Sequence, residues 1–176
     1  MTGQRHAATD SPRAFNEPVR LDLSDPDTLR QLWILQRASY AVEARLIGFD
    51  GIPPLHETLE QLRATDEFFL GIRDGSRLVG AVSWSRLPND ALDICRLVVH
   101  PVVHRRGVAT ALLDALDSIE PAELTVVSTG TSNLPAVELY RRRGFMPVGK
   151  RRIAPGVTVT LLERRYASAA QPIPHS

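Results

Sequence analysis

The sequence predicts an α/β or α+β domain built around a mixed sheet. Stretches with the alternation of β-strands and stretches with helical periodicity follow one another in the order β-α-α-β-β-β-α-β-α-β-β. The chain has 176 residues, which suits one domain with a sizeable core. It contains neither an internal repeat nor a linker long enough to separate two domains. We therefore expect one folded unit over residues 18–166, and disordered tails of polar or small residues at 1–17 and 167–176.

The first half of the chain combines a short strand, helices and a hairpin. Its predicted elements are a strand at 19–23, one or two helices in 25–49, a short helix at 55–64, paired strands at 67–74 and 78–86, and a strand at 91–99. Ser24 or Asp25 is the expected cap of the long helix, with Pro26 in its first turn. The stretch "GIPP" breaks the helical pattern after the long helix, and "DGSR" supplies the turn of the hairpin.

The second half alternates helices and strands. Its predicted elements are an amphipathic helix at 107–119, a strand at 122–128, a helix at 133–145, and strands at 145–153 and 157–166. In the helix "NLPAVELYRRRGF" a polar cap comes first and arginines fill the last turn. Asn133 and Tyr140 are seven residues apart, roughly two helical turns, so we expect both side chains on one face.

The composition is that of a soluble globular protein, with 43% apolar and 23% charged residues. The first 17 residues lack the apolar region of a secretory signal, and no apolar run approaches the roughly 18 residues of a membrane span. The single Cys95 rules out an intramolecular disulfide and favours a reducing compartment. We expect Cys95 to be a small core residue rather than a nucleophile, and we predict a cytoplasmic protein without a metal site.

Charge is unevenly distributed along the chain. Up to Cys95 there are 10 arginines and 14 acidic residues, whereas from Arg96 onward there are 11 basic and 6 acidic residues. One interpretation is scatter over a solvated surface. The other is that the second half holds a polyanion and the first half receives a cation.

The stretch "LVVHPVVHRRGVATALLDALD", residues 97–117, predicts an anion site. A strand ends at Val99, Pro101 stops it, and a basic turn leads through Gly107 into a helix. Free N–H groups in the first turn of a helix bind anions, and small residues let a phosphate approach the backbone. Taken alone, the same pattern fits a plain turn before an amphipathic helix.

Together with the helix at 133–145, this stretch resembles the GNAT superfamily of acyl-CoA-dependent N-acyltransferases. The matching features are the strand end "LVVHP", the helix start "HRRGVA" in place of Q/R-x-x-G-x-G/A, Asn133, Tyr140, and Gly144 with Phe145. The resemblance covers roughly residues 18–166 and implies a mixed, mostly antiparallel central sheet flanked by helices. His104 stands where the family has Gln or Arg. A neutral imidazole still donates one hydrogen bond, and Arg105 is adjacent.

The resemblance implies acetyl-CoA, or another short acyl-CoA, as cosubstrate. The residues that it assigns to binding this molecule are Leu97, Val98, Val99, His104, Arg105, Arg106, Gly107, Val108, Ala109, Asn133 and Tyr140. Backbone groups of 97–99 would hold the pantetheine arm and the thioester, and the N–H groups of 104–109 would surround the pyrophosphate. Asn133 would contact the arm, and Tyr140 would act as general acid towards the departing sulfur. Without the resemblance, Asn133 is a helix cap and Tyr140 a half-buried core aromatic.

The base that accepts the proton of the amine is less clearly indicated. Some members of the family carry a Glu about five residues before the Asn, where this chain has Ser128. Glu43, like Gln36 and Ser39, lies on or beside an apolar stripe of the first helix, which suggests a polar cleft. Glu43 is therefore the leading catalytic base or amine-binding residue. Weaker candidates are Glu57, His56 and Asp93, and a chain of waters is a further alternative.

The predicted function is transfer of an acetyl or short acyl group from acyl-CoA to a primary amine of a small molecule or peptide, by direct attack on the thioester. The alternative is a module that binds or senses acyl-CoA without catalysis. The clusters "RRR", "KRR" and "ERR" lack interleaved aromatics and a reading helix, so we expect no nucleic-acid partner. We expect no membrane partner either, and the identity of the amine and formation of a homodimer stay open.

Overall fold

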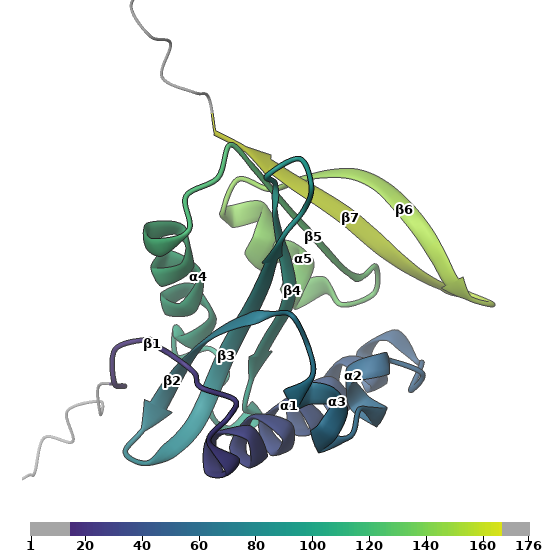
Figure 1. The fold of residues 1–176 in the computed structure, drawn as a ribbon. Helices are drawn as coiled ribbons and strands as arrows, with labels where there is room; N and C mark the ends of the chain where they lie inside the picture. Colours follow the sequence, from purple (N-terminus) through teal and green to yellow (C-terminus); the bar gives the residue numbers. More distant parts are fainter. Residues whose placement is uncertain (1–14, 167–176) are drawn as a thin grey trace, which may run out of the picture.

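The computed structural model describes residues 15–166, which form a seven-stranded sheet with helices on both faces (Figure 1). The strands, in the order β1-β2-β3-β4-β5-β7-β6, pair antiparallel except for the parallel pair β4–β5. The predicted mixed, mostly antiparallel sheet is therefore confirmed. The strands are β1 (Val19–Arg20), β2 (Phe68–Asp74), β3 (Arg77–Arg86), β4 (Leu92–Val99), β5 (Leu124–Gly130), β6 (Met146–Ala154) and β7 (Val157–Arg165).

The helices occur in the predicted order with one difference. They are α1 (Pro26–Ile47), α2 (Pro53–His56), α3 (Leu59–Arg63), α4 (Val108–Ile119), α5 (Leu134–Arg142) and the 3-10 helix η1 (Pro101–Val103). The prediction of one helix at 55–64 is wrong, because Thr58 starts a new helix. The Thr58 hydroxyl accepts a hydrogen bond from the Gln61 N–H, and the Gln61 side chain accepts one from the Thr58 N–H.

The described chain begins before residue 18. Asn16 donates a backbone hydrogen bond to Arg73 at 3.1 Å, and Phe15 packs against the core with the Arg106 guanidinium 4.5 Å from its ring centre. The expected disorder of the remaining residues 1–14 and 167–176 lies outside the described residues. None of the helices between residues 15 and 166 has the length and apolar character needed to cross a bilayer.

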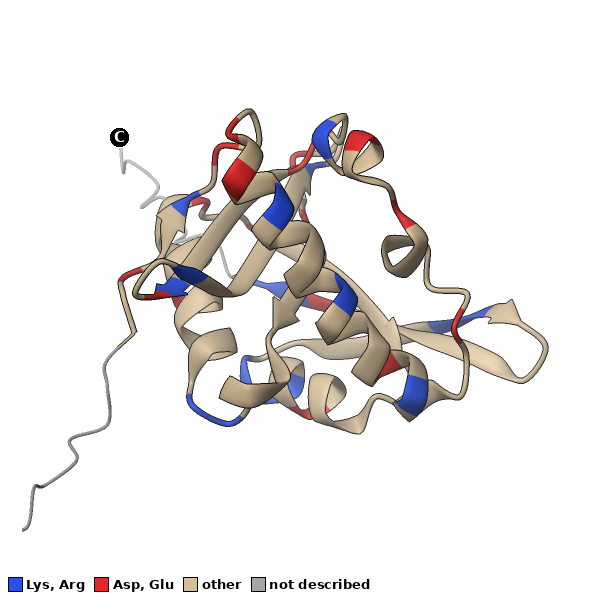
Figure 2. Cartoon of the chain, turned by 90° about the horizontal axis from the view of Figure 1, so that it is seen from below, with Lys and Arg blue, Asp and Glu red and all other residues tan. Residues whose placement is uncertain are grey.

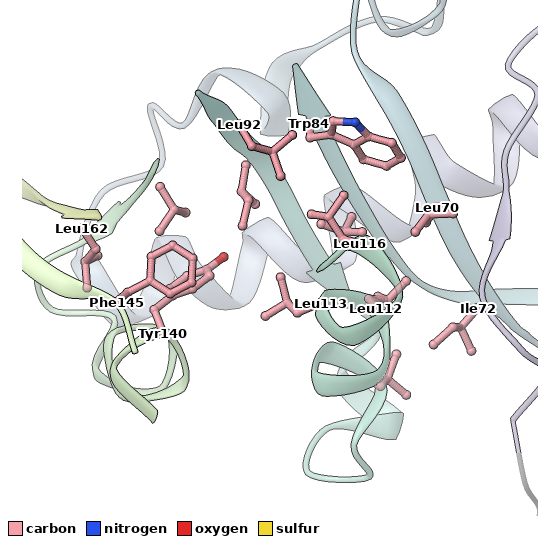
Figure 3. Packing of buried hydrophobic residues seen from close by; sticks show 14 of the residues in the cluster. Leu70, Ile72, Trp84, Leu92, Leu112, Leu113, Leu116, Tyr140, Phe145 and Leu162 are labelled. Atoms are coloured by element: carbon pink, nitrogen blue, oxygen red, sulfur yellow. The ribbon is translucent and has the colours of Figure 1, made fainter. Parts of the chain in front are cut away.

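Each face of the sheet has its own core. The larger core joins α4 and α5 to the sheet and includes Trp84, Leu112, Leu116, Tyr140 and Phe145 (Figure 3). The second core lies under α1 and α3 and includes Leu29, Leu32, Leu35, Leu62 and Phe69. Helices α1 and α5 therefore cover opposite faces, and residues on them can meet only where the sheet is interrupted.

Such an interruption lies between β4 and β5. The two strands pair over three positions, Leu92–Ile94 with Thr125–Val127. Beyond Ile94, β4 continues to Val99 and β5 to Gly130 without further pairs between them, and Figure 1 shows the strands diverging. The divergence leaves one side of the β4 backbone without a partner strand in the middle of the sheet.

Candidate active site

A cavity of about 420 Å³ opens where β4 and β5 part. Ile94 and Val127 line it from the sheet, Glu43 from α1, and Asn133 and Tyr140 from the α5 segment. Segment 49–54 and the β6–β7 hairpin contribute further walls. The cavity thus joins the two faces of the sheet through the gap, and it brings both predicted catalytic residues to one space.

Tyr140 lies at the inner wall of this cavity and is 3% exposed. Its ring packs edge-on against Phe145, with 5.4 Å between the ring centres (Figure 3). Burial raises the pKa of the Tyr140 phenol well above its usual range, the negative charge of Glu43 raises it further, and Arg143 opposes the shift. The phenol therefore carries its proton at neutral pH.

Asn133 both caps α5 and faces the cavity. Its side-chain oxygen accepts a hydrogen bond from the Ala136 N–H at 3.3 Å, so the capping role left open by the sequence is present. The side chain also lines the cavity on the same helix as Tyr140, two turns away, as the seven-residue spacing predicts. A contact of Asn133 with the cofactor arm stays a prediction.

Glu43 reaches the gap from α1 and is half-buried. Burial raises the pKa of its carboxyl group, and hydrogen bonds with the Asn133 side chain and the Gly130 backbone oppose part of that rise. The carboxylate is consequently a stronger base than one in water, and it lines the same cavity as residues of β5 and α5. This placement suits a residue that accepts a proton from an amine or binds an ammonium group.

The weaker base candidates lie elsewhere. The His56 ring is 2.6 Å from the Asp50 carbonyl oxygen, and Glu57 is engaged in a buried ion pair. Burial raises the pKa of Asp93, with a further rise from the charge of Glu67, but Asp93 does not line the cavity. Ser128 does line it and is too weak a base to replace a carboxylate.

A buried polar cluster, which the sequence did not reveal, adjoins the cavity through Arg96. Arg96 of β4 is 8% exposed and pairs with Glu57 at 2.5 Å and with Glu67 at 2.8 Å. Gln36 of α1 is fully buried, accepts from Arg96 at 3.0 Å and donates to Glu57 at 2.8 Å. Ser83 donates to Glu67 at 2.5 Å. The one readable signal was Gln36 on an otherwise apolar helical stripe.

This polar cluster holds the segment that walls the cavity between α1 and α3. Gln36 donates to the Pro54 carbonyl at 3.2 Å, and the Trp33 indole N–H donates to the Glu57 carbonyl at 2.8 Å. The neighbouring residues Gly51, Ile52, Pro53 and Pro54 line the cavity. The position of this wall therefore depends on Glu57 and its partners.

The prediction that Cys95 is a core residue is wrong. The register of β3 and β4 shifts between Ser83 and Trp84, so that Cys95 is an extra residue on β4 and is turned outward. It lines the cavity, and burial raises the pKa of its thiol to about 11. Cys95 is therefore protonated at neutral pH, and the predicted absence of a nucleophilic role agrees with its chemistry.

The loop before α4 has the features of an anion site. Gly107 is the N-cap of α4 with φ +81°, no side chain caps this end, and a Cβ placed on Gly107 would meet no atom within 4 Å. Arg105, at φ +61°, and Arg106 are exposed beside it. Free N–H groups, open space and positive charge therefore coincide at residues 104–109, which fits a pyrophosphate.

The end of β4 is held by contacts with the loop before α4 and with α1. His104 Nε2 lies 3.1 Å from the Val99 carbonyl oxygen, and the Val99 N–H donates to the Ser39 hydroxyl at 3.3 Å. A side chain on Gly80 would clash with Val108, so α4 approaches the sheet closely there. Both backbone polar groups of Val99 thus have partners in the protein. Leu97 lines the cavity, whereas Val98 is buried in the core under α1 and α3.

A second cavity, of about 440 Å³, lies between the ends of α4, β5 and β7. Its lining includes Asp117, Glu120, Arg164 and Tyr166 and none of the predicted site residues. Between residues 15 and 166, no group of three His, Cys, Asp or Glu side chains is arranged to hold a metal ion.

Comparison with known proteins defines the class to which this fold and cavity belong. The model of the acetyltransferase (GNAT) family matches residues 29–145. N-alpha-acetyltransferase RimI of Mycobacterium tuberculosis is 33% identical over 115 residues, which cover 63% of this chain and 72% of RimI. The chain therefore belongs to the GNAT acetyltransferase family. UPF0157 protein YqkA of Bacillus subtilis is 38% identical over 133 residues, which cover 75% of this chain and 38% of that longer relative.

Solved structures agree on the fold. PaiA N-acetyltransferase from Thermoplasma acidophilum, in complex with coenzyme A, has a TM-score of 0.69 at 16% identity and covers 88% of this chain and 100% of its own. The ribosomal-protein-S18-alanine N-acetyltransferase from Escherichia coli has a TM-score of 0.70 at 14% identity, over 90% of this chain and 98% of its own. At these identities the similarity establishes the arrangement of helices and strands alone.

Proposed function

We propose that this protein transfers an acetyl or other short acyl group from acyl-CoA to a primary amine of a small molecule or peptide. The observation that carries the proposal is the cavity at the β4–β5 gap, where Glu43, Asn133 and Tyr140 converge from two helices on opposite faces. A base and a proton donor stand on either side of one space. Acyl transfer to an amine needs one group that accepts a proton from the amine and one that donates a proton to the departing sulfur, and this arrangement offers both.

The cosubstrate follows from the family and from the loop before α4. The GNAT family uses acetyl-CoA, and one of the structural relatives was solved with coenzyme A bound. The uncapped N–H groups at Gly107, Val108 and Ala109 suit the pyrophosphate, with Arg105 and Arg106 adding positive charge. Residues 97–99 of β4 would hold the pantetheine arm beside the cavity, with the Val99 N–H and C=O exchanging their present partners Ser39 and His104 for the arm.

In the proposed reaction the amine attacks the thioester carbon directly. Glu43 accepts a proton from the amine, and the rise in its pKa on burial makes it a better acceptor near neutral pH. As the carbon–sulfur bond breaks, negative charge develops on sulfur, and the Tyr140 hydroxyl donates a hydrogen bond and then its proton there. Asn133, whose side chain counts among the causes that lower the Glu43 pKa, would orient that carboxylate.

The raised pKa of Tyr140 determines how its hydroxyl can assist departure of the CoA sulfur. A phenol is ordinarily a weaker acid than a thiol, and burial widens the difference. The same burial, however, also disfavours a thiolate that forms in the cavity, so its proton affinity rises together with that of Tyr140. The hydroxyl therefore stabilises developing charge first and transfers its proton late, which places its benefit at the lower end of the usual range for acid catalysis.

The competing function is a module that binds acyl-CoA without turnover. Such a module has no need of a titratable base and a protonated phenol facing one cavity, so the presence of Glu43 and Tyr140 there favours the enzyme. The test is thiol release from acetyl-CoA in the presence of a panel of amines, with mass spectrometry of the products. The panel includes peptides with a free α-amine, because the relative from Mycobacterium tuberculosis is named an N-alpha-acetyltransferase. Binding of acetyl-CoA without thiol release for any amine would establish the non-catalytic alternative.

A further inference from the structure

The outer edge of β6 is a surface that the proposed reaction leaves unused. β6 is the last strand of the sheet and pairs on one side only, with β7. Its residues from Met146 to Ile153 are all exposed. An edge strand presents a row of backbone N–H and C=O groups that can pair with another extended chain.

This edge adjoins the candidate active site. Arg151 and Ile153 of β6 are both part of the cavity lining, so the strand runs past the cavity mouth. The segment after α1 adds apolar groups to the same lining, with Phe49, Ile52 and Pro53. If the amino terminus of a polypeptide reached Glu43, the residues that follow it would extend out of the cavity alongside β6.

The edge also carries charge of one sign. Between Met146 and Leu162 the chain contains Lys150, Arg151 and Arg152 and no acidic residue. Figure 2 shows this basic stretch on the projecting hairpin. None of the three forms an ion pair within residues 15–166, whereas Arg143 and Arg164 are paired with carboxylates.

A purely protective role does not account for the sign of these charges. Edge strands often carry charges and irregularities that prevent edge-to-edge aggregation, and β6 has two register shifts against β7. Protection works with either sign or with a mixture. Three consecutive cations without ion pairs, of which Arg151 lines the cavity and its two neighbours alternate to the other face of the strand, instead provide electrostatic complementarity to an acidic segment along the edge.

We propose that the acceptor is the α-amine of a polypeptide that has acidic residues directly after its amino terminus, and that this segment adds to β6 as a further strand. Backbone pairing with β6 supplies affinity that is independent of sequence, and Lys150, Arg151 and Arg152 select the acidic side chains. The amino terminus then lies in the cavity beside Glu43. This inference rests on the proposed acyl transfer and specifies its acceptor.

The experiment compares peptides that share their first residue and carry Asp/Glu, Asn/Gln or Lys/Arg at the next three positions. Acetylation of the acidic peptides should show a kcat/KM on the order of tenfold above that of the neutral ones, and the advantage should shrink at high salt. Arg151→Glu should reduce or reverse the preference. Arg30→Glu, an equal change in net charge on an exposed position of α1, should retain it.

A second arm tests the added strand. Methylation of backbone nitrogens in the acidic peptide keeps every side chain but removes N–H donors, and it should lower kcat/KM severalfold. Equal rates for the methylated and unmethylated peptides would overturn strand addition, and equal rates for acidic, neutral and basic peptides would overturn the selectivity. In both cases the proposed transfer itself would stand. Absence of thiol release with every acceptor would instead overturn the transfer. A dimer of the free protein that Arg151→Glu dissociates in sedimentation would show that a second copy occupies the edge, and it would overturn the addition of a peptide strand.

Discussion

Tyr140 and Glu43 reach one cavity from helices that cover opposite faces of the sheet, and their chemistry is complementary. Burial keeps the Tyr140 phenol protonated and strengthens the Glu43 carboxylate as a base. The two effects have one cause, the removal of both groups from bulk water. Each proposed role can be tested by a conservative substitution, Tyr140→Phe for the hydroxyl and Glu43→Gln for the carboxylate.

Tyr140→Phe removes the hydroxyl and keeps the ring that packs against Phe145. We expect kcat to fall roughly 10- to 100-fold, because a thiolate is already a fair leaving group and needs only part of the usual acid assistance. The Kd for acetyl-CoA should stay within twofold, since the proton is required only as the bond breaks. Steady-state kinetics and calorimetry measure the two quantities.

Tyr40 provides the comparison for that substitution, because it is a second buried phenol in the same cavity. If Tyr140→Phe turned over at the wild-type rate with chemistry limiting, Tyr140 would be a packing residue. If Tyr40→Phe showed the large loss instead, the proton donor would be Tyr40. A rise in the KM for acetyl-CoA with unchanged kcat would make Tyr140 a cofactor ligand.

Glu43→Gln should lower turnover and flatten the dependence of rate on pH. In the wild type, the rate should fall at low pH as Glu43 is protonated, with an inflection above the ordinary value for a glutamate because burial raises the pKa. The affinity for acetyl-CoA should change little. Equal activity of the two proteins from about pH 6 to 9 would transfer the role of base to another group.

The same substitution makes a prediction about stability with a defined sign. Because the pKa of Glu43 is raised in the folded protein, folding favours its protonated form. Its contribution is most favourable below the unfolded pKa and is lost as pH rises through the folded pKa. Glu43→Gln should therefore unfold at a higher temperature than the wild type at about pH 7 and at a similar temperature near about pH 4. A wild type that is the more stable protein at neutral pH would contradict this account of the site.

At the level of elements, the N-terminus of α4 is expected to hold the anionic part of the cosubstrate. Gly107→Val places a side chain in the open space before the first N–H groups of the helix. We expect the Kd for acetyl-CoA to rise about tenfold or more, since several charge-assisted hydrogen bonds of roughly 1.5–3 kcal/mol each are at stake.

Gly75→Val is the matched control for this substitution. Gly75 also has a positive φ, +61°, and open space before its Cβ, but it lies in the β2–β3 turn. Both variants should lose stability for the same backbone reason. Only Gly107→Val should weaken binding, and an unchanged Kd in a folded Gly107→Val protein would remove the pyrophosphate from this loop.

The segment from α2 to α3 is expected to position the acceptor through Glu57. Glu57→Gln breaks one of the two ion pairs of the buried Arg96 and loosens the wall at Ile52–Pro54. We expect a lower melting temperature and a severalfold higher KM for the amine, with the Kd for acetyl-CoA within twofold. Glu60→Gln removes an exposed carboxylate on the adjacent α3 and should alter neither quantity. If Glu57→Gln and Glu60→Gln had the same KM for the amine, the role of Glu57 would be purely structural.

At the level of the whole molecule, the order of elements could be predicted because each helix and strand is encoded by local periodicity and caps. The motifs at Gly107 and Asn133 identified the family for the same reason. Cys95 could not be placed, because its exposure follows from a register shift against the preceding strand β3, and the residue pattern of β4 alone does not reveal that shift. The ion pairs of Arg96 likewise depend on Glu57 and Glu67, which only the folded chain brings together. Thr58 and Gln61 did contain a readable signal for a new helix, and the prediction of one helix overlooked it.

The central claim is that the gap between β4 and β5 is where acyl-CoA and the amine meet, and hydrogen exchange with and without acetyl-CoA tests it most directly. Backbone amides at the unpaired end of β4, residues 95–99, and in the first turn of α4, residues 107–111, should exchange more slowly when acetyl-CoA is bound. The amides around the second cavity, at 117–125, should be unaffected. Saturating acetyl-CoA that left residues 95–99 and 107–111 unprotected, or that protected 117–125 instead, would contradict the claim.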